Sequence, residues 1–599
     1  MLALVFAALL GVSFERWGHP RTDLGGALDR AARIAAGEVL YRDVQSPYGP
    51  LPDYVVAAGF RVFGTRLAVA WTIGLFLILV ESALLLRIAR RFCSPAQCLV
   101  GLTGFWVLFA FTPGLFGWVL PNTFASTFGA TAATLALALA IEARERGTPG
   151  PFVAASIAAG VAGLCKLDYG FAAAVAVVLA ACLVPGRRAR LLPAAVVPGL
   201  VVAGLVLGLF ASLVPWDVLV SDNLYRMRSL GRSVAALRAA VPEWSVVVPS
   251  ALGRYGLEAP IRTAVAATGF ALAASGGARV VLGLALAGAA IALPLLPGYP
   301  GQLDFTLFAA SIGYAWTPLA WLIVAVVAVE GARRSDAADA ALLLAGAWSV
   351  AQALRWDLRL VWPSYYGVLA PFLVVFVAGR LASVLVSAPT ALAAACVVAV
   401  PVAMQAAINA QHYVTVYRWV LSYPRGTLRM PVMGGQQLAT VVDYVRQHTG
   451  PDDWVAVFPE ERFVNFLAER RQPTRDSGTG PGWLATRQDE EQCIAQLEAR
   501  RPALIVLSDR RWPEFGAGDL GSYNPTLVAW VEREYEPVLI TTPGVVRYRI
   551  YAPRSSGIAQ QPRGAAEGTG ERAREGLLHE LALAEDAAPG ARLARRGEQ

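Results

Sequence analysis

Long apolar stretches separated by short charged turns dominate the first two thirds of the sequence. A helix that crosses a bilayer needs about 20 apolar residues, and we therefore expect about thirteen membrane-spanning helices up to residue 410. The first run is short and is also compatible with a cleaved signal peptide, although no basic residue precedes it. The runs lie at 1–14, 67–86, 96–112, 121–141, 147–165, 169–186, 191–214, 263–278, 280–297, 305–329, 340–354, 364–379 and 388–410.

The composition supports a polytopic membrane protein. Of the 599 residues, 56% are hydrophobic and only 16% are charged, whereas soluble domains carry roughly 25% charge. The net charge of +8 is mild, and no basic patch with interleaved aromatic residues occurs, so we do not expect nucleic-acid binding. The cysteines and histidines are too scattered for a disulfide framework or a zinc site. We expect neither a metal nor a cofactor.

Arginine residues in the short turns predict the orientation. If the N-terminus is cytoplasmic and the spans alternate, six cytoplasmic turns contain 12 arginines, and the short opposite turn at 113–120 contains none. This asymmetry is typical of cytoplasmic loops. It places the loop 15–66, the loop 215–262, the turn 355–363 and the C-terminal part on the outer face.

The sequence changes character after the last apolar run. Within 411–555, strand-like runs at 454–458, 503–507 and 545–551 alternate with helical runs at 435–448, 488–500 and 526–534. This alternation predicts a small α/β domain on the outer face. It has no glycine-rich phosphate loop. Residues 556–599 have the composition of a disordered tail.

The first outer loop contains candidate catalytic carboxylates. Apolar residues recur at helical spacing between Asp23 and Gly37, which predicts a helix on the membrane surface with Asp23 at its start. A carboxylate there is favoured by the helix dipole, so Asp23 is either a capping residue or a catalytic base at the boundary between membrane and water. Asp29 is a less favoured choice, and we expect it on a solvated helix face with Arg30 and Arg33.

Lys166 is the only lysine, since the other 50 basic residues are arginines. It lies between two predicted spans at the outer boundary, close to Asp168. One interpretation is a snorkelling lysine paired with Asp168, but an arginine would snorkel equally well. Ionisable groups at membrane depth are functional candidates, and we expect Lys166 to be one.

A second cationic candidate is the outer turn that contains Arg355, Asp357 and Arg359. Arginine and tryptophan are common interfacial anchors, which is one interpretation of this turn. The other is that Arg355 and Arg359 bind a lipid phosphate and that Asp357 orients one of them.

The first loop also resembles a known family. The segments Asp23-Leu-Gly25, Gly37-Glu-Val-Leu-Tyr-Arg-Asp43 and Tyr48-Gly-Pro-Leu51 resemble the first loop of bacterial GT-C glycosyltransferases, which include the protein O-mannosyltransferases and the lipid A aminoarabinose transferases. The segment 463–474 is similar to the outer domains of such enzymes. The resemblance implies a GT-C type helical membrane domain at 1–410 with the outer domain at 411–555.

The resemblance implies a transferase that uses a polyprenyl-phosphate sugar as donor, with inversion at the anomeric carbon. The acceptor is a glycan, a lipid or a protein reached from the outer face of the cytoplasmic membrane. By position the catalytic aspartate maps onto Asp23, and Asp43, next to Arg42, is a second candidate. Better-known members have Asp-Glu at the first position where this chain has Asp23-Leu24. A lysine at position 166 also resembles the family's layout, and the resemblance implies that Lys166 binds the donor phosphate.

Two other functions compete with this interpretation. A transporter or lipid flippase would show duplicated halves and broken helices, but the sequence has no internal repeat and its ionisable residues gather at one face. A non-catalytic scaffold that presents the α/β domain would not need the patterned first loop. A glycosyltransferase therefore remains our leading prediction.

Overall fold

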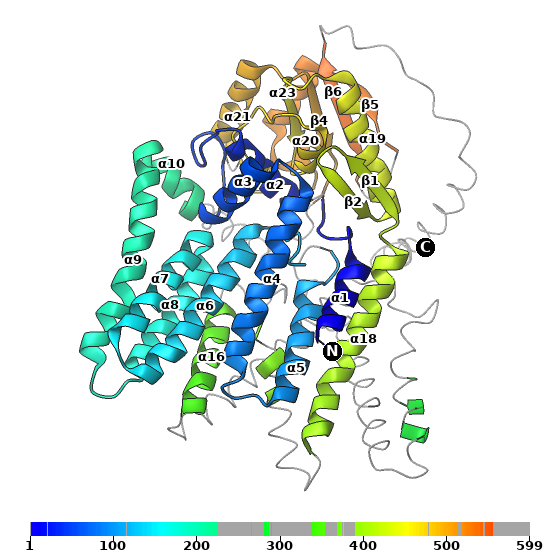
Figure 1. Cartoon of the computed structure of the whole chain (residues 1–599). Coiled ribbons are helices and arrows are strands. Elements are labelled where there is room, and N and C mark those ends of the chain that lie inside the picture. Colours follow the sequence, from blue (N-terminus) through cyan, green and yellow to red (C-terminus); the bar gives the residue numbers. More distant parts are fainter. Residues whose placement is uncertain are drawn as a thin grey trace, which may run out of the picture.

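A bundle of helices carries a small mixed sheet at one end (Figure 1). The computed structural model describes residues 2–20, 22–114, 117–225, 265, 281–283, 285–286, 289, 337–353, 368–369, 371–373, 375–376, 390–476, 478–484, 486–511, 518–542 and 546–554. The predicted runs at 263–278, 280–297, 305–329 and 364–379 lie wholly or largely outside these residues. The predicted tail at 556–599 also lies outside them.

The other nine apolar runs coincide with helices. Three of the described helices, which begin at Leu67, Phe124 and Ala189, are long and apolar enough to cross a membrane. The helices of this part are α1 (Leu2–Ser13), α4 (Leu67–Ala89), α5 (Pro95–Phe105) continued by the π-helix η1 (Trp106–Ala110), α6 (Phe124–Arg146), α7 (Pro149–Cys165), α8 (Leu167–Cys182), α9 (Arg188–Leu213), α16 (Ala337–Ala353) and α18 (Thr390–Thr415).

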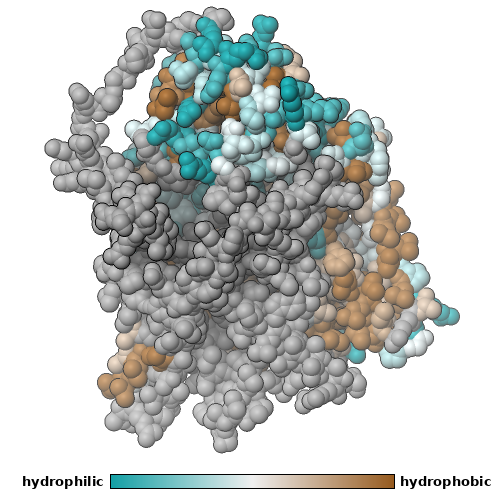
Figure 2. Space-filling view, turned by 180° about the vertical axis from the view of Figure 1, so that it is seen from behind, coloured by the Kyte–Doolittle hydropathy of each residue, from teal (hydrophilic) through white to brown (hydrophobic). Residues whose placement is uncertain are grey.

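Helix α6 lies at the centre and α9 at the edge of this bundle. In its most apolar window α6 is 78% buried, whereas α9 is only 17% buried. Helix α6 begins where the Thr123 hydroxyl accepts a hydrogen bond from the Ala125 amide, and it ends at Gly147 in the left-handed conformation. Four leucines of α9, Leu200, Leu205, Leu209 and Leu213, are exposed. Figure 2 shows hydrophobic residues gathered over the helices below the hydrophilic end of the molecule. An exposed apolar face of this kind fits a lipid environment.

Small residues let α7 and α9 approach closely. A Cβ added to Gly160 would lie 2.5 Å from the carbonyl oxygen of Gly199. The Gly199 amide in turn donates to the Ser156 hydroxyl at 2.9 Å. Close contact through small residues replaces the hydrophobic driving force that membrane helices lack.

The loop after α1 forms two further helices, α2 (Asp23–Ala35) and α3 (Leu51–Phe63), at the end of the bundle that carries the sheet (Figure 1). The predicted helix at 23–37 is therefore present, two residues shorter than expected. Its residues Leu24, Leu28 and Ala31 are fully buried. The short helices α10 (Trp216–Val220) and η2 (Ser221–Tyr225) follow α9 at the same end.

The C-terminal part contains the sheet. A hairpin of β1 (Trp419–Tyr423) and β2 (Gly426–Met430) precedes a four-stranded sheet in the order β3-β4-β6-β5, in which β3 and β4 are parallel and the other neighbours antiparallel. The boundary predicted at residue 410 falls inside α18. The remaining elements are α19 (Val432–His448), β3 (Val455–Phe458), α20 (Phe463–Ala468), α21 (Arg487–Arg500), β4 (Leu504–Ser508), α22 (Leu520–Tyr523), α23 (Pro525–Glu534), β5 (Tyr535–Ile540) and β6 (Tyr548–Pro553).

The two faces of the sheet belong to different cores. Ala456 and Phe458 of β3 pack with residues of α21 and α23, whereas Val455 and Val457 belong to a core that includes α19, α20 and α2. Alternating residues of a strand point to opposite faces, so β3 contributes to both. The sheet is thus joined to the helical part through a continuous apolar core.

Candidate active site

Asp23 begins α2 and faces the start of α6. The Asn122 side-chain amide donates a hydrogen bond to the Asp23 carboxylate at 2.9 Å, and the carbonyl oxygen of the same amide accepts from the Thr22 hydroxyl at 2.7 Å. The N-cap of α2 is Thr22, so Asp23 is the first helical residue and not the cap. Its carboxylate is partly buried and oriented by a neighbouring element.

Lys166 also contacts the start of α6. It is in extended conformation between α7 and α8, and its ammonium group donates to the Ser126 hydroxyl at 3.2 Å and lies 5.2 Å from the centre of the Tyr48 ring. Ser126 is in the first turn of α6. Asn122 and Ser126 therefore place Asp23 and Lys166 around the amino end of α6, where the helix dipole favours an anion.

Asp168 follows Lys166 in the first turn of α8. One of its carboxylate oxygens accepts a hydrogen bond from the neighbouring Tyr169 amide at 3.0 Å. Asp168 is therefore close to Lys166 in the sequence, and its hydrogen bond stabilises the first turn of α8. The candidates Arg355, Asp357 and Arg359 lie outside the described residues.

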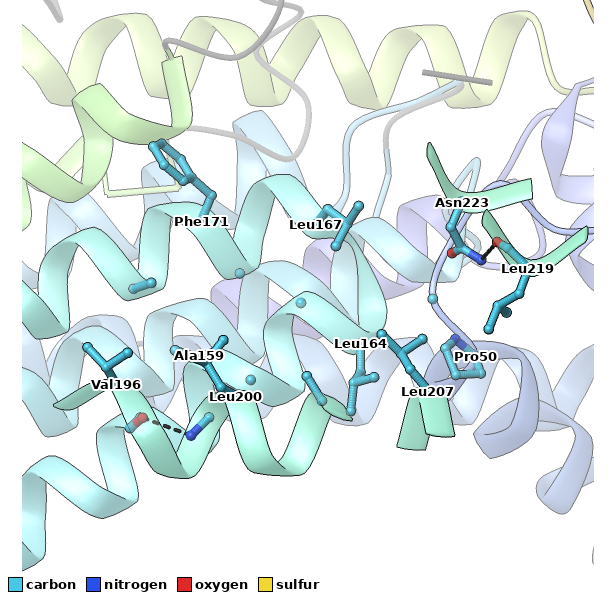
Figure 3. A pocket seen from close by; sticks show the side chains of 18 of the residues that line it. Pro50, Ala159, Leu164, Leu167, Phe171, Val196, Leu200, Leu207, Leu219 and Asn223 are labelled. Carbon is cyan, nitrogen blue, oxygen red and sulfur yellow. Dashed lines mark hydrogen bonds between the residues drawn. The ribbon is translucent and has the colours of Figure 1, made fainter. Parts of the chain in front are cut away.

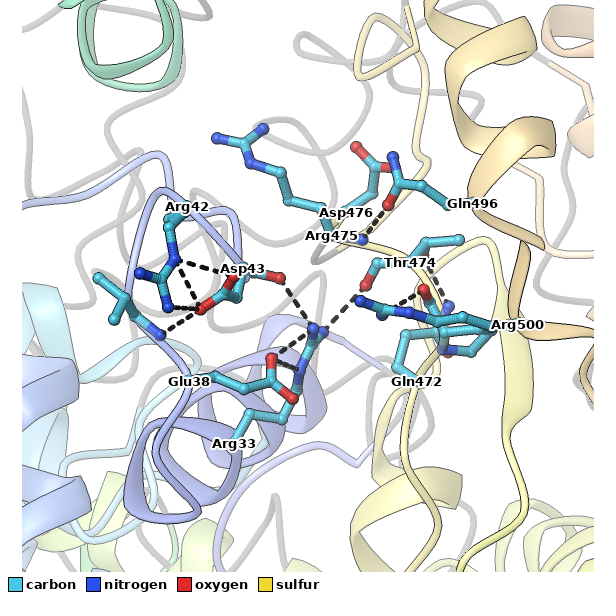
Figure 4. Close-up of polar contacts among 12 residues, drawn as sticks. Arg33, Glu38, Arg42, Asp43, Gln472, Thr474, Arg475, Asp476, Gln496 and Arg500 are labelled. Atoms are coloured by element: carbon cyan, nitrogen blue, oxygen red, sulfur yellow. Dashed lines mark hydrogen bonds and ion pairs between the residues drawn. The ribbon is translucent and has the colours of Figure 1, made fainter. Parts of the chain in front are cut away.

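Asp43, the second candidate carboxylate, closes a tight turn. It accepts from the Val39 amide at 2.8 Å and from the Arg42 guanidinium at 2.7 Å. The hydrogen bond from Arg42 lowers the pKa of Asp43, and the Val39 amide acts in the same direction. Figure 4 shows this pair at the edge of a polar network. These contacts give Asp43 a structural role in the turn.

The network of Figure 4 joins the first loop to the C-terminal part. The Arg33 guanidinium binds the Glu38 carboxylate at 2.7 Å and donates to the carbonyl oxygens of Asp43 and Thr474 at 2.9 and 3.0 Å. Arg475 donates to the carbonyl oxygen of Tyr41 at 2.7 Å. The loop is therefore held in one position relative to the sheet.

The expectation that Asp29, Arg30 and Arg33 form a solvated helix face was wrong. All three are at most 6% exposed. Arg30 forms an ion pair with Asp53 of α3 at 3.3 Å, and burial raises the pKa of Asp29, although nearby arginines oppose this. The C-terminal part and α3 cover this face of α2, which a helical wheel of α2 alone cannot show.

Helix α2 packs directly on α20. A Cβ added to Gly25 would lie 2.4 Å from the backbone nitrogen of Phe463, a distance at which side chain and backbone clash. Glycine at position 25 thus permits the contact of α2 with the chain that enters α20. The segment that leads into α20 also contains Glu460.

Glu460 is a site residue that the sequence analysis missed. Its side chain is 12% exposed and forms an ion pair with Arg510. Burial raises the pKa of Glu460 well above its usual value, and the charge of Asp23 adds to this. No local motif marks Glu460, because Asp23 lies at the other end of the chain.

An apolar cavity of about 420 Å³ lies beside the site. It is lined mainly by α7, α8 and α9 (Figure 3), and Leu164 and Leu167 on either side of Lys166 are part of its wall. Gly49 and Pro50 of the first loop close one end. Within the described ranges no group of three or more His, Cys, Asp or Glu side chains is placed to hold a metal ion.

No family model and no curated protein matched the sequence. Solved structures of similar fold include ArnT from Cupriavidus metallidurans bound to undecaprenyl phosphate, at 15% identity over 94% of this chain and 99% of that chain with a TM-score of 0.44. The archaeal oligosaccharyltransferase AglB from Archaeoglobus fulgidus, in complex with an inhibitory peptide and a dolichol-phosphate, is similar at 14% identity over 92% of this chain and 74% of that chain, with a TM-score of 0.47.

Both structures are of GT-C superfamily members, the superfamily that the first loop of this chain resembles. The chemistry of the site is inferred from the residues of this chain.

Proposed function

We propose that the chain is a membrane glycosyltransferase that moves a sugar from a polyprenyl-phosphate donor to a glycan, lipid or protein acceptor. The reaction takes place on the outer face of the cytoplasmic membrane. The observation that carries the proposal is the arrangement of Asp23 and Lys166 around the amino end of α6, beside an apolar cavity.

The donor has two chemically different parts, and the site offers a place for each. The isoprenoid tail enters the apolar cavity between α7, α8 and α9. The phosphate binds Lys166 at the mouth of this cavity, where the positive end of the α6 dipole adds to the attraction. Arg355 and Arg359, oriented by Asp357, are our proposed further phosphate ligands.

Asp23 is the proposed general base. The acceptor oxygen attacks the anomeric carbon while Asp23 takes the proton of the acceptor hydroxyl. The bond from that carbon to the phosphate oxygen breaks, and its electron pair stays on the phosphate beside Lys166. Phosphate is a good leaving group, so this reaction needs cations at the leaving oxygens and does not need the strong second acid of glycoside hydrolysis.

The experiment is a transfer assay with radiolabelled polyprenyl-phosphate sugars on the purified full chain. Asp23→Asn preserves the size of the side chain and removes the base, so the transfer rate should fall by roughly 10²–10⁴-fold while donor binding persists. Asp452→Asn is the control, because its side chain is 94% exposed and pairs with the exposed Arg471 at 3.0 Å.

Two results would change the proposal. Normal transfer by Asp23→Asn together with loss of transfer by Asp43→Asn would assign the base to Asp43. Movement of the lipid across the bilayer without sugar transfer would make the chain a flippase.

A further inference from the structure

Asn122 connects the proposed base to a tightly packed part of the helical bundle. The segment that leads into α6 contains Val119 and Leu120, which are fully buried. Glycines on two neighbouring elements permit this packing. A Cβ added to Gly74 of α4 would lie 2.1 Å from the Val119 carbonyl oxygen. One added to Gly18 of the first loop would lie 3.1 Å from the Cβ of Leu120. The backbone that carries Asn122 is therefore fixed between α4 and the first loop.

The Thr22 hydroxyl is directed to Asn122 and not to its own helix. Thr22 is the N-cap of α2, a position where a threonine oxygen usually accepts from an amide of the first turn, but within the described first turn of α2 its side chain forms no such bond. It lies 2.7 Å from Oδ1 of Asn122 and 2.8 Å from the His19 carbonyl oxygen. A hydroxyl has a single proton to donate. The His19 carbonyl oxygen already accepts from the Thr22 amide at 3.2 Å, so the hydroxyl proton is better used at Asn122.

This hydrogen bond sets the direction of the Asn122 amide. With Oδ1 accepting from Thr22, the nitrogen Nδ2 faces Asp23 and donates to its Oδ2 at 2.9 Å. The reverse orientation would place the amide oxygen against a carboxylate oxygen, and two acceptors repel each other. An amide donor binds an ionised carboxylate through one oxygen and leaves the other oxygen, Oδ1 of Asp23, for a different partner.

We propose that Asn122 is a positioning residue for sugar transfer: it holds Oδ2 of Asp23, so that Oδ1 takes the proton of the acceptor hydroxyl. This inference rests on the proposed function, in which Asp23 is the base. Thr22 contributes by preventing rotation of the Asn122 amide. In each turnover the acceptor O–H bond breaks as the oxygen bonds to the anomeric carbon. The proton passes to Oδ1 of Asp23 and then to solvent, while Asn122 and Thr22 retain their own protons.

The first experiment tests the contact without any substrate. The infrared difference spectrum between the purified full chain and its Asp23→Asn variant contains the carboxylate stretching bands of Asp23. Hydrogen bonding to one carboxylate oxygen makes the two C–O bonds unequal and separates these bands. The same difference taken in the Asn122→Ala background should therefore show a smaller separation. Equal band positions in the two backgrounds would mean that Asn122 does not hold the carboxylate, and this would overturn the proposal.

The second experiment measures transfer from a radiolabelled polyprenyl-phosphate sugar. Asn122→Ala should lower kcat roughly a hundredfold, as expected for a misplaced catalytic group, and should leave the KM for the donor unchanged. Thr22→Val removes only the hydroxyl that orients the amide, so its kcat should fall less. Thr22→Ser retains the hydroxyl and should transfer like the wild type. A purely structural asparagine would instead lower the melting temperature and leave kcat of the folded protein unchanged.

A double-mutant cycle decides whether Asn122 acts through Asp23. If it does, adding Asn122→Ala to Asp23→Asn should cost no further activity, because the group that Asn122 positions is already gone. Losses that add up in the double variant would show that Asn122 acts independently of the base, and they would overturn the proposal.

The matched control is Asn524→Ala in the C-terminal part. Asn524 is 1% exposed, and its side-chain amide donates to the Leu484 carbonyl oxygen at 3.0 Å. Its loss should lower the melting temperature and leave both kcat and the Asp23 bands unchanged. A shift of the Asp23 bands in Asn122→Ala, combined with no sugar transfer by the wild type, would confirm the contact and reject the proposed function.

Discussion

Lys166 is the only lysine, whereas the other 50 basic residues are arginines. Its ammonium group has defined neighbours. Ser126 accepts its hydrogen bond, and the Tyr48 ring lies within cation–π distance. Leu164 and Leu167 next to it line the cavity. An ammonium group is compact and has three rotatable donors, whereas a guanidinium is a larger planar fork. This difference makes Lys166 testable by substitution.

Lys166→Met retains the apolar stem and removes the charge. A charged hydrogen bond contributes about 1.5–3 kcal/mol, so the affinity for a polyprenyl-phosphate donor should fall about tenfold to a hundredfold. Lys166→Arg should restore only part of this affinity. Binding of labelled donor and thermal stability are measured on both variants.

A purely structural lysine gives a different result. Lys166→Arg would then have no effect, and Lys166→Met would lower the melting temperature while donor affinity stays constant. This result would remove Lys166 from the proposed site and would leave the role of Asp23 untouched.

The sequence predicted those candidate residues whose side chains differ in kind from the residues around them. Asp23 stands out at the start of an amphipathic segment, and Lys166 stands out as the only lysine. Glu460 does not stand out, because glutamates are common in its part of the chain. Its importance comes from a contact between distant segments, which no pattern along the chain encodes.

At the scale of elements, the close approach of α2 to α20 positions the start of α2. It depends on the absence of a side chain at Gly25, where a Cβ would lie 2.4 Å from the Phe463 nitrogen. Gly25→Ala should therefore separate α2 from α20, displace Asp23 at the start of α2, and lower both stability and transfer. Core overpacking costs about 1–3 kcal/mol. Thermal unfolding and the transfer assay are the measurements.

Gly204→Ala is the matched control for this substitution. Gly204 lies inside α9, and a Cβ there would meet nothing within 4 Å. Alanine is a better helix former than glycine by roughly 0.5–1 kcal/mol, so this variant should be as stable as the wild type or more so. Equal effects of the two substitutions would contradict the close approach of α2 and α20.

Hydrophobic periodicity predicted the elements that bury a continuous apolar surface. The predicted helix at 435–448 and the predicted strand at 503–507 lie within two or three residues of α19 and β4. The hairpin β1–β2 and the strand β5 were not predicted. β5 begins Tyr535-Glu-Pro537 and lacks the regular alternation of a half-buried strand. β2 does alternate, with Leu428 and Met430 buried, but it has only five residues and its pattern is too short to stand out. These strands form because neighbouring strands supply their hydrogen bonds.

At the scale of the whole molecule, charged turns and the candidate site lie at opposite ends of the bundle (Figure 1). Arg91 pairs with Glu145 at 2.6 Å, which joins the ends of α4 and α6. Arg187 donates to the Gly147 carbonyl oxygen at 3.0 Å, which joins the start of α9 to the same end. In the part of the chain that the structure describes, the arginine-bearing turns at 87–91, 144–146 and 187–190 are therefore separated from α2 and the sheet.

This separation gives a prediction about the two sides of the membrane. Arginine-rich turns remain on the cytoplasmic side, so α2, Lys166 and the sheet should face the outside, where a polyprenyl-phosphate donor would be used. A reporter that is active only outside the cytoplasm should give signal when fused after Arg554 and none when inserted in the turn 187–190. The reverse pattern would place Asp23, Lys166 and Glu460 on the cytoplasmic side. The donor would then have to be presented from the inner leaflet, so this measurement decides from which leaflet the lipid enters the cavity.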